Sequence, residues 1–184
     1  MAIYRFNNQT PSIHPTVYIS PNATIIGNIS IGENSSVWFN CVLRGDCDAI
    51  VIGKNTNIQD MTMCHEDYGK PLTIGDGVTI GHKCVIHGCT IEDNCLIGMG
   101  SIIMNGARIG KGSIIAAGSV VLENSDIPPF SLVAGIPGKI KRQLDESVLE
   151  LIKLPADNYS ERALDYSSNK LEICDRSGNF QNAV

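Results

Sequence analysis

The fold is decided by residues 91–121, which read IEDNCLIGMGSIIMNGARIGKGSIIAAGSVV. An aliphatic residue returns at every sixth position of this stretch, namely Ile91, Ile97, Ile103, Ile109, Ile115 and Val121. A small residue follows four positions after each of the first five: Cys95, Ser101, Ala107, Ser113 and Ser119. A period of six fits neither an α-helix nor an alternating β-strand, and it is typical of the hexapeptide repeat of a β-solenoid.

The same period extends towards the N-terminus. It is carried by Ile19, Ile25, Ile31, Val37 and Leu43, and it resumes after interruptions with Ile52, Ile58 and Cys64 and then with Ile74, Ile80 and Ile86. In such a repeat each hexapeptide forms one short strand and one turn, and three hexapeptides close a triangular coil whose aliphatic side chains point inward. Successive coils are joined by backbone hydrogen bonds at a spacing of about 4.8 Å. We therefore predict an all-β solenoid, a parallel β-helix, over residues 1–142.

The pattern fades after Val121, where prolines and glycines interrupt the chain. Residues 143–172 are expected to form a helical segment that packs on the rod. A first helix would place Leu144, Val148, Leu151 and Ile152 on one face, and a second, beginning after Pro155, would carry Tyr159, Ala163 and Tyr166. Residues 173–184 are expected to form a frayed tail.

Composition excludes several classes of protein. The chain has 184 residues and a formal charge of −5, which disfavours nucleic-acid and anionic-membrane partners. No apolar run approaches the roughly 20 residues that a membrane span requires, and Met1 is not followed by a signal-peptide pattern. The seven cysteines are odd in number and do not follow a secreted disulfide pattern, so we expect a reducing, cytoplasmic location.

Most of the cysteines are explained by the repeat. Cys41, Cys47, Cys84 and Cys95 fall in the position of the small residue, and Cys64 falls in the aliphatic position. We expect these thiols to be buried as small apolar side chains. The repeat assigns no role to Cys89 or Cys174.

Polar residues that the repeat does not require can be assigned to faces by counting hexapeptides. If residues 43–51 form one repeat with three extra residues and residues 64–73 one repeat with four, Leu43, Cys64 and Ile86 stack on successive coils. The residues that follow them, Arg44, His65 and His87, then form one outer column, with the two histidines about 5 Å apart. By the same rule Asp60 and His82 stack on another edge of the triangle, and Gln59 lies beside Asp60.

Two adjacent histidines supply two nitrogen ligands, whereas a catalytic zinc site needs three protein ligands and an open position. Because His82 lies on another edge, a neighbouring subunit packed about a three-fold axis could bring its own His82 to His65 and His87. The alternative is that these histidines form a chance ladder. His14 is expected to be an ordinary surface histidine.

Five short motifs together indicate a family. They are Leu43-Arg44-Gly45-Asp46, Asn57-Ile58-Gln59-Asp60, Cys64-His65-Glu66-Asp67, the run from Gly81-His82 to His87-Gly88, and Val133-Ala134-Gly135-Ile136-Pro137. With them, residues 10–142 resemble the γ-class carbonic anhydrases. The resemblance implies a homotrimer of left-handed β-helices with C-terminal helices along the rod. It also implies a metal ion, usually zinc, with Fe²⁺ or Co²⁺ also able to serve, held by His65 and His87 of one chain and His82 of the next.

The resemblance also implies an activity and roles for further residues. A metal-bound hydroxide would attack CO2, bicarbonate would leave, and a proton would pass to solvent. Gln59 matches the residue that orients the hydroxide, Arg44 and Asp60 match an ion pair between subunits, and Asp46 matches another interface acid. Relatives with a longer acidic loop after the first histidine carry a glutamate there that shuttles protons. This chain has only Glu66 and Asp67 before Tyr68, so these acids are either substitutes for that glutamate or surface acids that solvate a turn.

Other interpretations stay open at this point. Tyr159 either reaches the site from its helix or only packs that helix against the rod. The fold also supports acyltransferases that use acyl-CoA, although these carry one catalytic histidine on a long loop and need no cluster of three. A metal-dependent hydrolase of another substrate, such as an acyl thioester, and a catalytically silent trimer stapled by metal are further alternatives.

Overall fold

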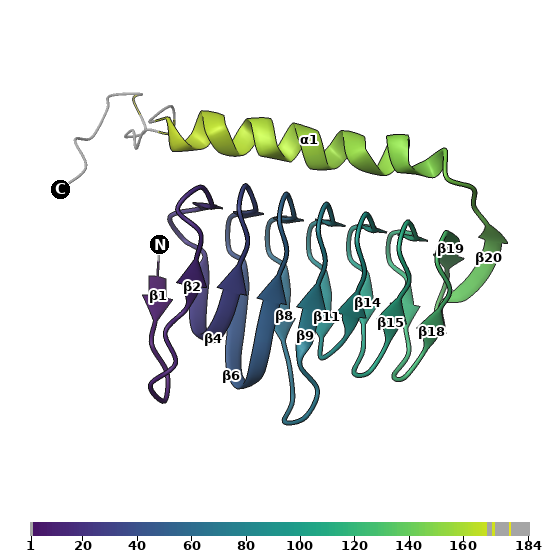
Figure 1. The fold of residues 1–184 in the computed structure, drawn as a ribbon, viewed down its shortest axis with the longest axis horizontal. Coiled ribbons are helices and arrows are strands. Elements are labelled where there is room, and N and C mark those ends of the chain that lie inside the picture. Colours follow the sequence, from purple (N-terminus) through teal and green to yellow (C-terminus); the bar gives the residue numbers. More distant parts are fainter. Residues whose placement is uncertain (1, 169–170, 172–176, 178–184) are drawn as a thin grey trace.

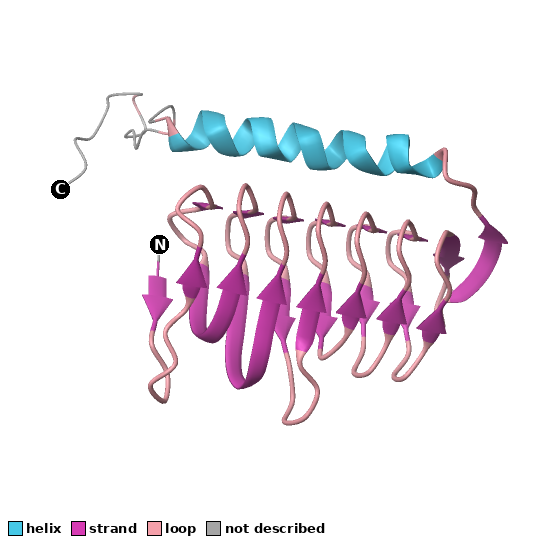
Figure 2. Cartoon of the chain, in the orientation of Figure 1, coloured by secondary structure: helices cyan, strands magenta, loops and turns pink. Residues whose placement is uncertain are grey.

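The computed structural model of the chain describes residues 2–168, 171 and 177. Figure 1 shows a rod of stacked coils with one long helix, α1 (Val148–Ser167), lying along its side. Colouring by secondary structure shows that each coil consists of short strands joined by turns (Figure 2). This arrangement confirms the predicted β-solenoid.

Two faces of the rod belong to one twelve-stranded sheet. Its strands are β1 (Ala2–Tyr4), β2 (Ser12–Ile13), β4 (Thr24–Ile31), β6 (Val42–Ile52), β8 (Met63–His65), β9 (Leu72–Ile74), β11 (Val85–His87), β12 (Thr90–Ile91), β14 (Ile102–Ile103), β15 (Arg108–Ile109), β17 (Val120–Val121) and β18 (Asp126–Ile127). The strands β8, β11, β14 and β17 stack on one face, and β9, β12, β15 and β18 stack on the other. The long strand β6 pairs with both β8 and β9, so it turns the corner between these faces.

The third face is an eight-stranded sheet. Its strands are β3 (Tyr18–Ile19), β5 (Ser36–Val37), β7 (Asn57–Ile58), β10 (Thr79–Ile80), β13 (Leu96–Ile97), β16 (Ile114–Ile115), β19 (Ser131–Ala134) and β20 (Lys139–Gln143). Pairing is parallel from β3 to β19, whereas β20 folds back antiparallel on β19 and ends the stack.

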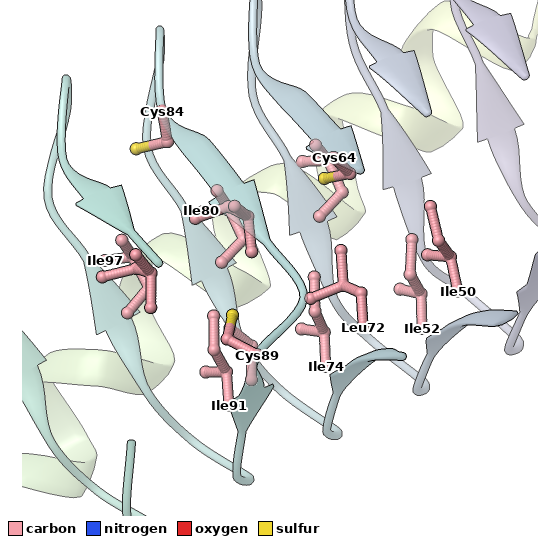
Figure 3. Close-up of a cluster of buried hydrophobic side chains, with 14 of the residues drawn as sticks. Ile50, Ile52, Cys64, Leu72, Ile74, Ile80, Cys84, Cys89, Ile91 and Ile97 are labelled. Carbon is pink, nitrogen blue, oxygen red and sulfur yellow. The ribbon is translucent and has the colours of Figure 1, made fainter. Parts of the chain in front are cut away.

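Inward-facing aliphatic side chains form the core (Figure 3). On the third face Ile58, Ile80, Ile97 and Ile115 are paired in register from coil to coil, and all four are completely buried. Burying one such side chain contributes roughly 1.5–3 kcal/mol, so the ladder supplies a large share of the rod's stability. The predicted stacks of Leu43 on Cys64 and of Cys64 on Ile86 are also confirmed by the strand register.

Burial explains four of the five thiols that the repeat assigns. Cys41, Cys64, Cys84 and Cys95 are buried, and desolvation raises the pKa of Cys41 and Cys84 to about 11 and that of Cys95 to about 12. The expectation for Cys47 was wrong, because this thiol is only partly buried. It lies at the corner of β6, where extra residues interrupt the repeat between the parts of β6 that pair with β8 and β9.

Cys89, to which the repeat assigned no role, lies in the core, and its burial raises the thiol pKa to about 12. Cys174 falls outside the described residues, as does the expected tail at 173–184 apart from residue 177.

The prediction of two helices was wrong. Residues 139–143 form β20, and a single helix of 20 residues continues through Pro155. Proline lacks an amide hydrogen and usually marks a helix boundary. Here the helix persists because its inner face, with Ile152, Ala156 and Ala163 buried, packs on the rod. Leu151, expected on the packed face, is 60% exposed. Within the described part of the chain, no helix is long and apolar enough to cross a membrane.

Truncating one rung of the core ladder should destabilise the rod. We expect Ile97→Ala to lower the free energy of unfolding by about 2–5 kcal/mol, because Ile97 is completely buried and the cavity cannot close between two fixed coils. Urea unfolding at one protein concentration measures the change. Leu154→Ala, which truncates a side chain that is 62% exposed on α1, is the control and should change stability by less than about 0.5 kcal/mol. Equal losses in the two variants would contradict the ladder as the main source of stability.

Candidate metal centre

Two histidines lie on adjacent rungs of the face formed by β6, β8 and β11. His65 ends β8, His87 ends β11, and the two are paired in register, with Arg44 of β6 on the rung before them. The predicted outer column is therefore confirmed. Nδ1 of His65 lies 3.0 Å from Nε2 of His87, and the ring centroids are 5.0 Å apart.

The other ring nitrogen of His65 contacts a carboxylate. Nε2 of His65 lies 3.0 Å from Oδ1 of Asp46, and Arg44 Nη1 donates to both Asp46 oxygens, at 2.7 and 2.5 Å. Burial raises the pKa of Asp46, but hydrogen bonds from Arg44 and His65 outweigh it and hold the pKa below its usual value. An ionised carboxylate only accepts hydrogen bonds, so we assign the proton of the neutral His65 ring to Nε2, which leaves the lone pair on Nδ1.

In His87 the other ring nitrogen, Nδ1, makes the outer hydrogen bond. Its Nδ1 lies 2.8 Å from Oδ1 of Asn105, an acceptor, which leaves the lone pair on Nε2. Asn105 sits in the turn after β14, one coil beyond His87. It was not selected from the sequence, because an asparagine beside a glycine is an ordinary turn signal.

The two free lone pairs therefore point at each other across 3.0 Å. Such an arrangement is repulsive unless a proton or a metal ion lies between the nitrogens. Two nitrogens that bind one zinc ion tetrahedrally, each at about 2.1 Å, lie about 3.4 Å apart, which is close to the observed separation. This orientation suits a pair of ligands for one metal ion.

His82 is oriented in the same way on a different edge of the rod. It follows β10, and its Nδ1 lies 2.8 Å from Oδ2 of Asp60, whose Oδ1 accepts from the amide of Phe39 at 3.3 Å. Its Nε2 is therefore the nitrogen with the free lone pair. Among the described residues, no hydrogen bond or ion pair joins His82 to His65 or His87, so a single chain does not bring the three together.

Tyr159 of α1 reaches His82. Its hydroxyl lies 3.3 Å from His82 Nε2, and its ring packs edge-on against Trp38 with the centroids 5.0 Å apart. Burial, and then the nearby charge of Asp60, raises the pKa of Tyr159, so the hydroxyl stays protonated and can donate. Tyr159 therefore packs α1 against the rod and also contacts His82, and its role in a site stays a prediction.

Gln59 is buried and held by a chain of side-chain hydrogen bonds. Its Nε2 donates to Oδ1 of Asn57 at 3.0 Å, and Asn57 in turn donates to Thr79 at 2.9 Å. The amide nitrogen is thereby fixed, and the carbonyl oxygen is the group left to accept a further hydrogen bond.

Of the two interpretations of Glu66, the one that makes it a surface acid was wrong, and its part in proton transfer stays a prediction. Glu66 is completely buried, its Oε1 accepts from the amide of Cys47 at 3.1 Å, and its Oε2 has no hydrogen-bond partner. It braces the corner where β6 turns between two faces. Asp67 is exposed, and its carboxylate accepts from Asn105 at 2.7 Å.

The predicted ion pair between Arg44 of one chain and Asp60 of the next stays a prediction. Within the chain, Arg44 contacts Asp46 and Asp60 contacts His82.

A second grouping of possible metal ligands overlaps the first. One ligand atom each of Asp46, Cys47 and His65 lies within 4.8 Å of the others. Two features disfavour this cluster. Asp46 already accepts from Arg44 and His65. Desolvation, and then the charges of Glu66 and Asp46, raises the pKa of Cys47, which disfavours the thiolate that a metal needs.

Comparison with known proteins agrees with the solenoid fold. The profile "Bacterial transferase hexapeptide (six repeats)" matches residues 10–45 and 88–123, and "Hexapeptide repeat of succinyl-transferase" matches residues 71–103. The chain is 41% identical to "Gamma carbonic anhydrase 2, mitochondrial" of Arabidopsis thaliana, over 83% of this chain and 57% of that longer protein. It is 55% identical to "Probable carbonic anhydrase" of Methanocaldococcus jannaschii, over 80% of this chain and 92% of that protein.

This chain belongs to the γ-carbonic anhydrase family. The wider superfamily also contains transferases. A solved structure described as a hexapeptide transferase family protein from Anaplasma phagocytophilum is 39% identical to this γ-carbonic anhydrase homologue. It covers 90% of this chain and 98% of its own, with a TM-score of 0.86.

Replacing Asp46 by asparagine should weaken metal binding while the rod stays folded. A carboxamide can donate to Nε2 of His65, which lets the proton move to Nδ1, the nitrogen that faces His87. We expect the metal dissociation constant of Asp46→Asn to rise by about ten- to a hundredfold in competition with a chromogenic chelator.

Asp126→Asn is the matched control, since it removes the same charge from an exposed ion pair with Arg108. Equal affinity in Asp46→Asn and the wild type would show that Asp46 does not orient His65.

Proposed function

We propose that this chain is a metal-dependent carbonic anhydrase that interconverts CO2 and bicarbonate at sites shared between three identical subunits. The observation that carries the proposal is the convergence of the free lone pairs of His65 and His87, together with the matching orientation of His82. The 55% identity to a protein named as a carbonic anhydrase supports the same activity.

The metal would be held by His65 Nδ1 and His87 Nε2 of one chain and by His82 Nε2 of its neighbour. Imidazole nitrogens suit zinc, iron and cobalt rather than magnesium or calcium. When bound there, the ion would supply a hydroxide nucleophile at neutral pH by lowering the pKa of water to about 7. Each histidine keeps its outer nitrogen on a fixed acceptor, Asp46, Asn105 or Asp60, so the ligands need little reorganisation.

An apolar stripe beside the histidines supports a neighbouring subunit at this face. It consists of outward-facing residues paired in register on successive coils: Val42, Met63, Val85, Ile102 and Val120. Val85 and Ile102 are each 36% exposed. A continuous stripe of this kind is typical of a surface covered by another protein.

The edge that carries His82 offers a second apolar surface. Met99 occupies the position of His82 on the next coil, and Met61 lies one position beyond Asp60 on the coil before; they are 59% and 50% exposed. Pairing the stripe of one chain with the His82 edge of the next is a head-to-tail contact, and such contacts close into a ring when the rotation is three-fold. The site would therefore exist only in the assembled trimer.

The remaining polar residues would act on the reacting molecules or on the ligands. Gln59, with its nitrogen fixed on Asn57, would accept a hydrogen bond from the attacking water at its carbonyl oxygen and so orient it. Tyr159 would donate from its hydroxyl to an oxygen of CO2 or bicarbonate beside His82. Asp46 and Asp60 would orient His65 and His82, and Arg44 would hold Asp46 in place. We assign Glu66 a structural role at the corner of β6.

A transferase is the second candidate, because a hexapeptide transferase family protein shares 39% of the sequence. An acyl transfer reaction would leave three separately oriented histidines without a purpose. A hydrolase of another substrate would use the same residues, so measured activity distinguishes it from a carbonic anhydrase.

Mixed trimers test whether the site is shared between subunits. We expect His82→Ala and His87→Ala each to lose stoichiometric metal when purified alone, with the rods still folded. When the two variants are refolded together in equal amounts, one interface of every mixed trimer joins an intact His65 and His87 to an intact His82. Random assortment then restores about one quarter of the wild-type sites.

Metal content by elemental analysis measures the recovery, and the two variants mixed without refolding are the control. Stoichiometric metal in pure His82→Ala would show that His82 is not a ligand. Absence of any recovery after refolding together would show that the site is not shared.

Stopped-flow CO2 hydration tests the reaction itself. We expect activity proportional to bound metal in the wild-type protein, and a kcat lower by about a hundredfold in Gln59→Ala with metal content unchanged, because the attacking water loses its orientation. A fully metallated wild-type trimer that does not hydrate CO2 would contradict the proposal. It would favour hydrolysis of another substrate, such as an acyl thioester, or a metal that only staples the trimer.

A further inference from the structure

The amide of Asn105 bridges a histidine of the candidate metal site and an acid in the loop that follows the other histidine. Its Oδ1 lies 2.8 Å from Nδ1 of His87, and its Nδ2 donates to Oδ2 of Asp67 at 2.7 Å. Asp67 lies two residues beyond His65, at the start of the short loop after β8. The contact between Asn105 and Asp67 joins positions 38 residues apart in sequence.

Asp67 determines which way the amide faces. The two ends of an asparagine amide differ only in hydrogen bonding, so the direction has to be inferred from the partners. An ionised carboxylate only accepts, so the NH2 group of Asn105 must face Asp67 and its oxygen must face His87. The oxygen in turn requires the proton of His87 on Nδ1, which leaves Nε2 free towards His65.

The backbone leaves room for this amide. A Cβ atom at Gly88 would lie 2.1 Å from Oδ1 of Asn105 and 3.0 Å from the carbonyl oxygen of Lys70. Gly88 also has a φ of +50°, a conformation that favours glycine. The amide therefore reaches His87 through a space that any other residue at position 88 would fill.

The loop that presents Asp67 is itself anchored. The amide of Lys70 donates to the carbonyl oxygen of Asp67 at 2.9 Å, which closes a tight turn. At the tip of the turn, the amide of Gly69 donates to Oδ2 of Asp48 on β6 at 3.1 Å. The short loop is thus held from both sides, which fixes the position of the Asp67 carboxylate.

We propose that Asn105 is a positioning residue for His87, and that Asp67 acts through it to determine which ring nitrogen of the neutral imidazole carries the proton. The loop after the first histidine thereby prepares the second histidine for the metal. This inference rests on the proposed metal site. We call the hydrogen bonds that run from Asp67 through Asn105 to His87 the relay. Without the relay, His87 could carry its proton on Nε2, the nitrogen that the metal requires, and metal binding would have to displace that proton.

Metal affinity of the intact protein, measured by competition with a chromogenic zinc chelator, tests the role of Asn105. Asn105→Ala should weaken zinc binding by about ten- to a hundredfold. Asn22→Ala is the matched control, because it removes an amide-to-amide bond of 2.9 Å to Asn40 between two other coils and touches no histidine. Unchanged affinity in Asn105→Ala would overturn the inference.

A swap of the two groups separates positioning from simple structural support. Asn105→Asp alone brings two carboxylates together, and Asp67→Asn alone leaves the amide of Asn105 free to turn, so both should weaken zinc binding. The double variant Asn105→Asp/Asp67→Asn restores a carboxylate that accepts from His87 and from the new amide, and most of the wild-type affinity should return. If the double variant binds zinc no more tightly than the weaker-binding single variant, the relay is overturned. The proposal predicts that the effects of the two substitutions on zinc affinity are strongly coupled.

Long-range ¹H–¹⁵N NMR of the metal-free protein gives a readout that does not depend on metal. It should show His87 protonated on Nδ1 in the wild type and a mixture of tautomers in Asp67→Asn. A wild-type His87 protonated on Nε2 would overturn the inference. Failure of the wild type to bind zinc, with His87 protonated on Nδ1, would overturn the proposed metal site and leave the relay standing.

Discussion

The rest of the structure depends on the stacking of inward aliphatic side chains at the spacing of backbone hydrogen bonds between coils. Because each coil must place its isoleucine on the one below, as Ile80 does on Ile58, the outward residues are also held in register. Neighbouring rungs lie about 4.8 Å apart, a distance at which two imidazoles can turn one nitrogen each towards a common point. The core therefore sets the separation of His65 and His87, although neither side chain belongs to it.

The core sets the distance between the histidines but not the orientation of their rings. Three hydrogen-bond acceptors orient the rings. Asp46, Asn105 and Asp60 each hold the outer nitrogen of one histidine and so leave the inner nitrogen free. These acceptors come from three different parts of the rod: strand β6, the turn after β14 and the turn after β7. The proposed metal site would thus use contacts along the rod axis and around its corner.

Extra residues interrupt the hexapeptide repeat at two places, and both carry polar contacts near the histidines. The extra residues after Leu43 let β6 turn a corner, which the buried Glu66 braces through the amide of Cys47. The extra residues after Cys64 form the short loop that presents Asp67 to Asn105. In both places inserted residues add polar contacts beside the histidines while the aliphatic ladder continues on either side.

The sequence by itself determined the solenoid, the stacking of Arg44, His65 and His87, and the burial of most thiols, because a six-residue period leaves one inward position per strand. It could not show that α1 runs through Pro155, since packing of Ile152 and Ala163 on the rod outweighs the local preference of proline. It also could not show the burial of Glu66, the partly buried position of Cys47, or the bridge from Asp67 through Asn105 to His87. Those features depend on side chains from separate coils meeting at a corner, and only the tertiary structure decides such contacts.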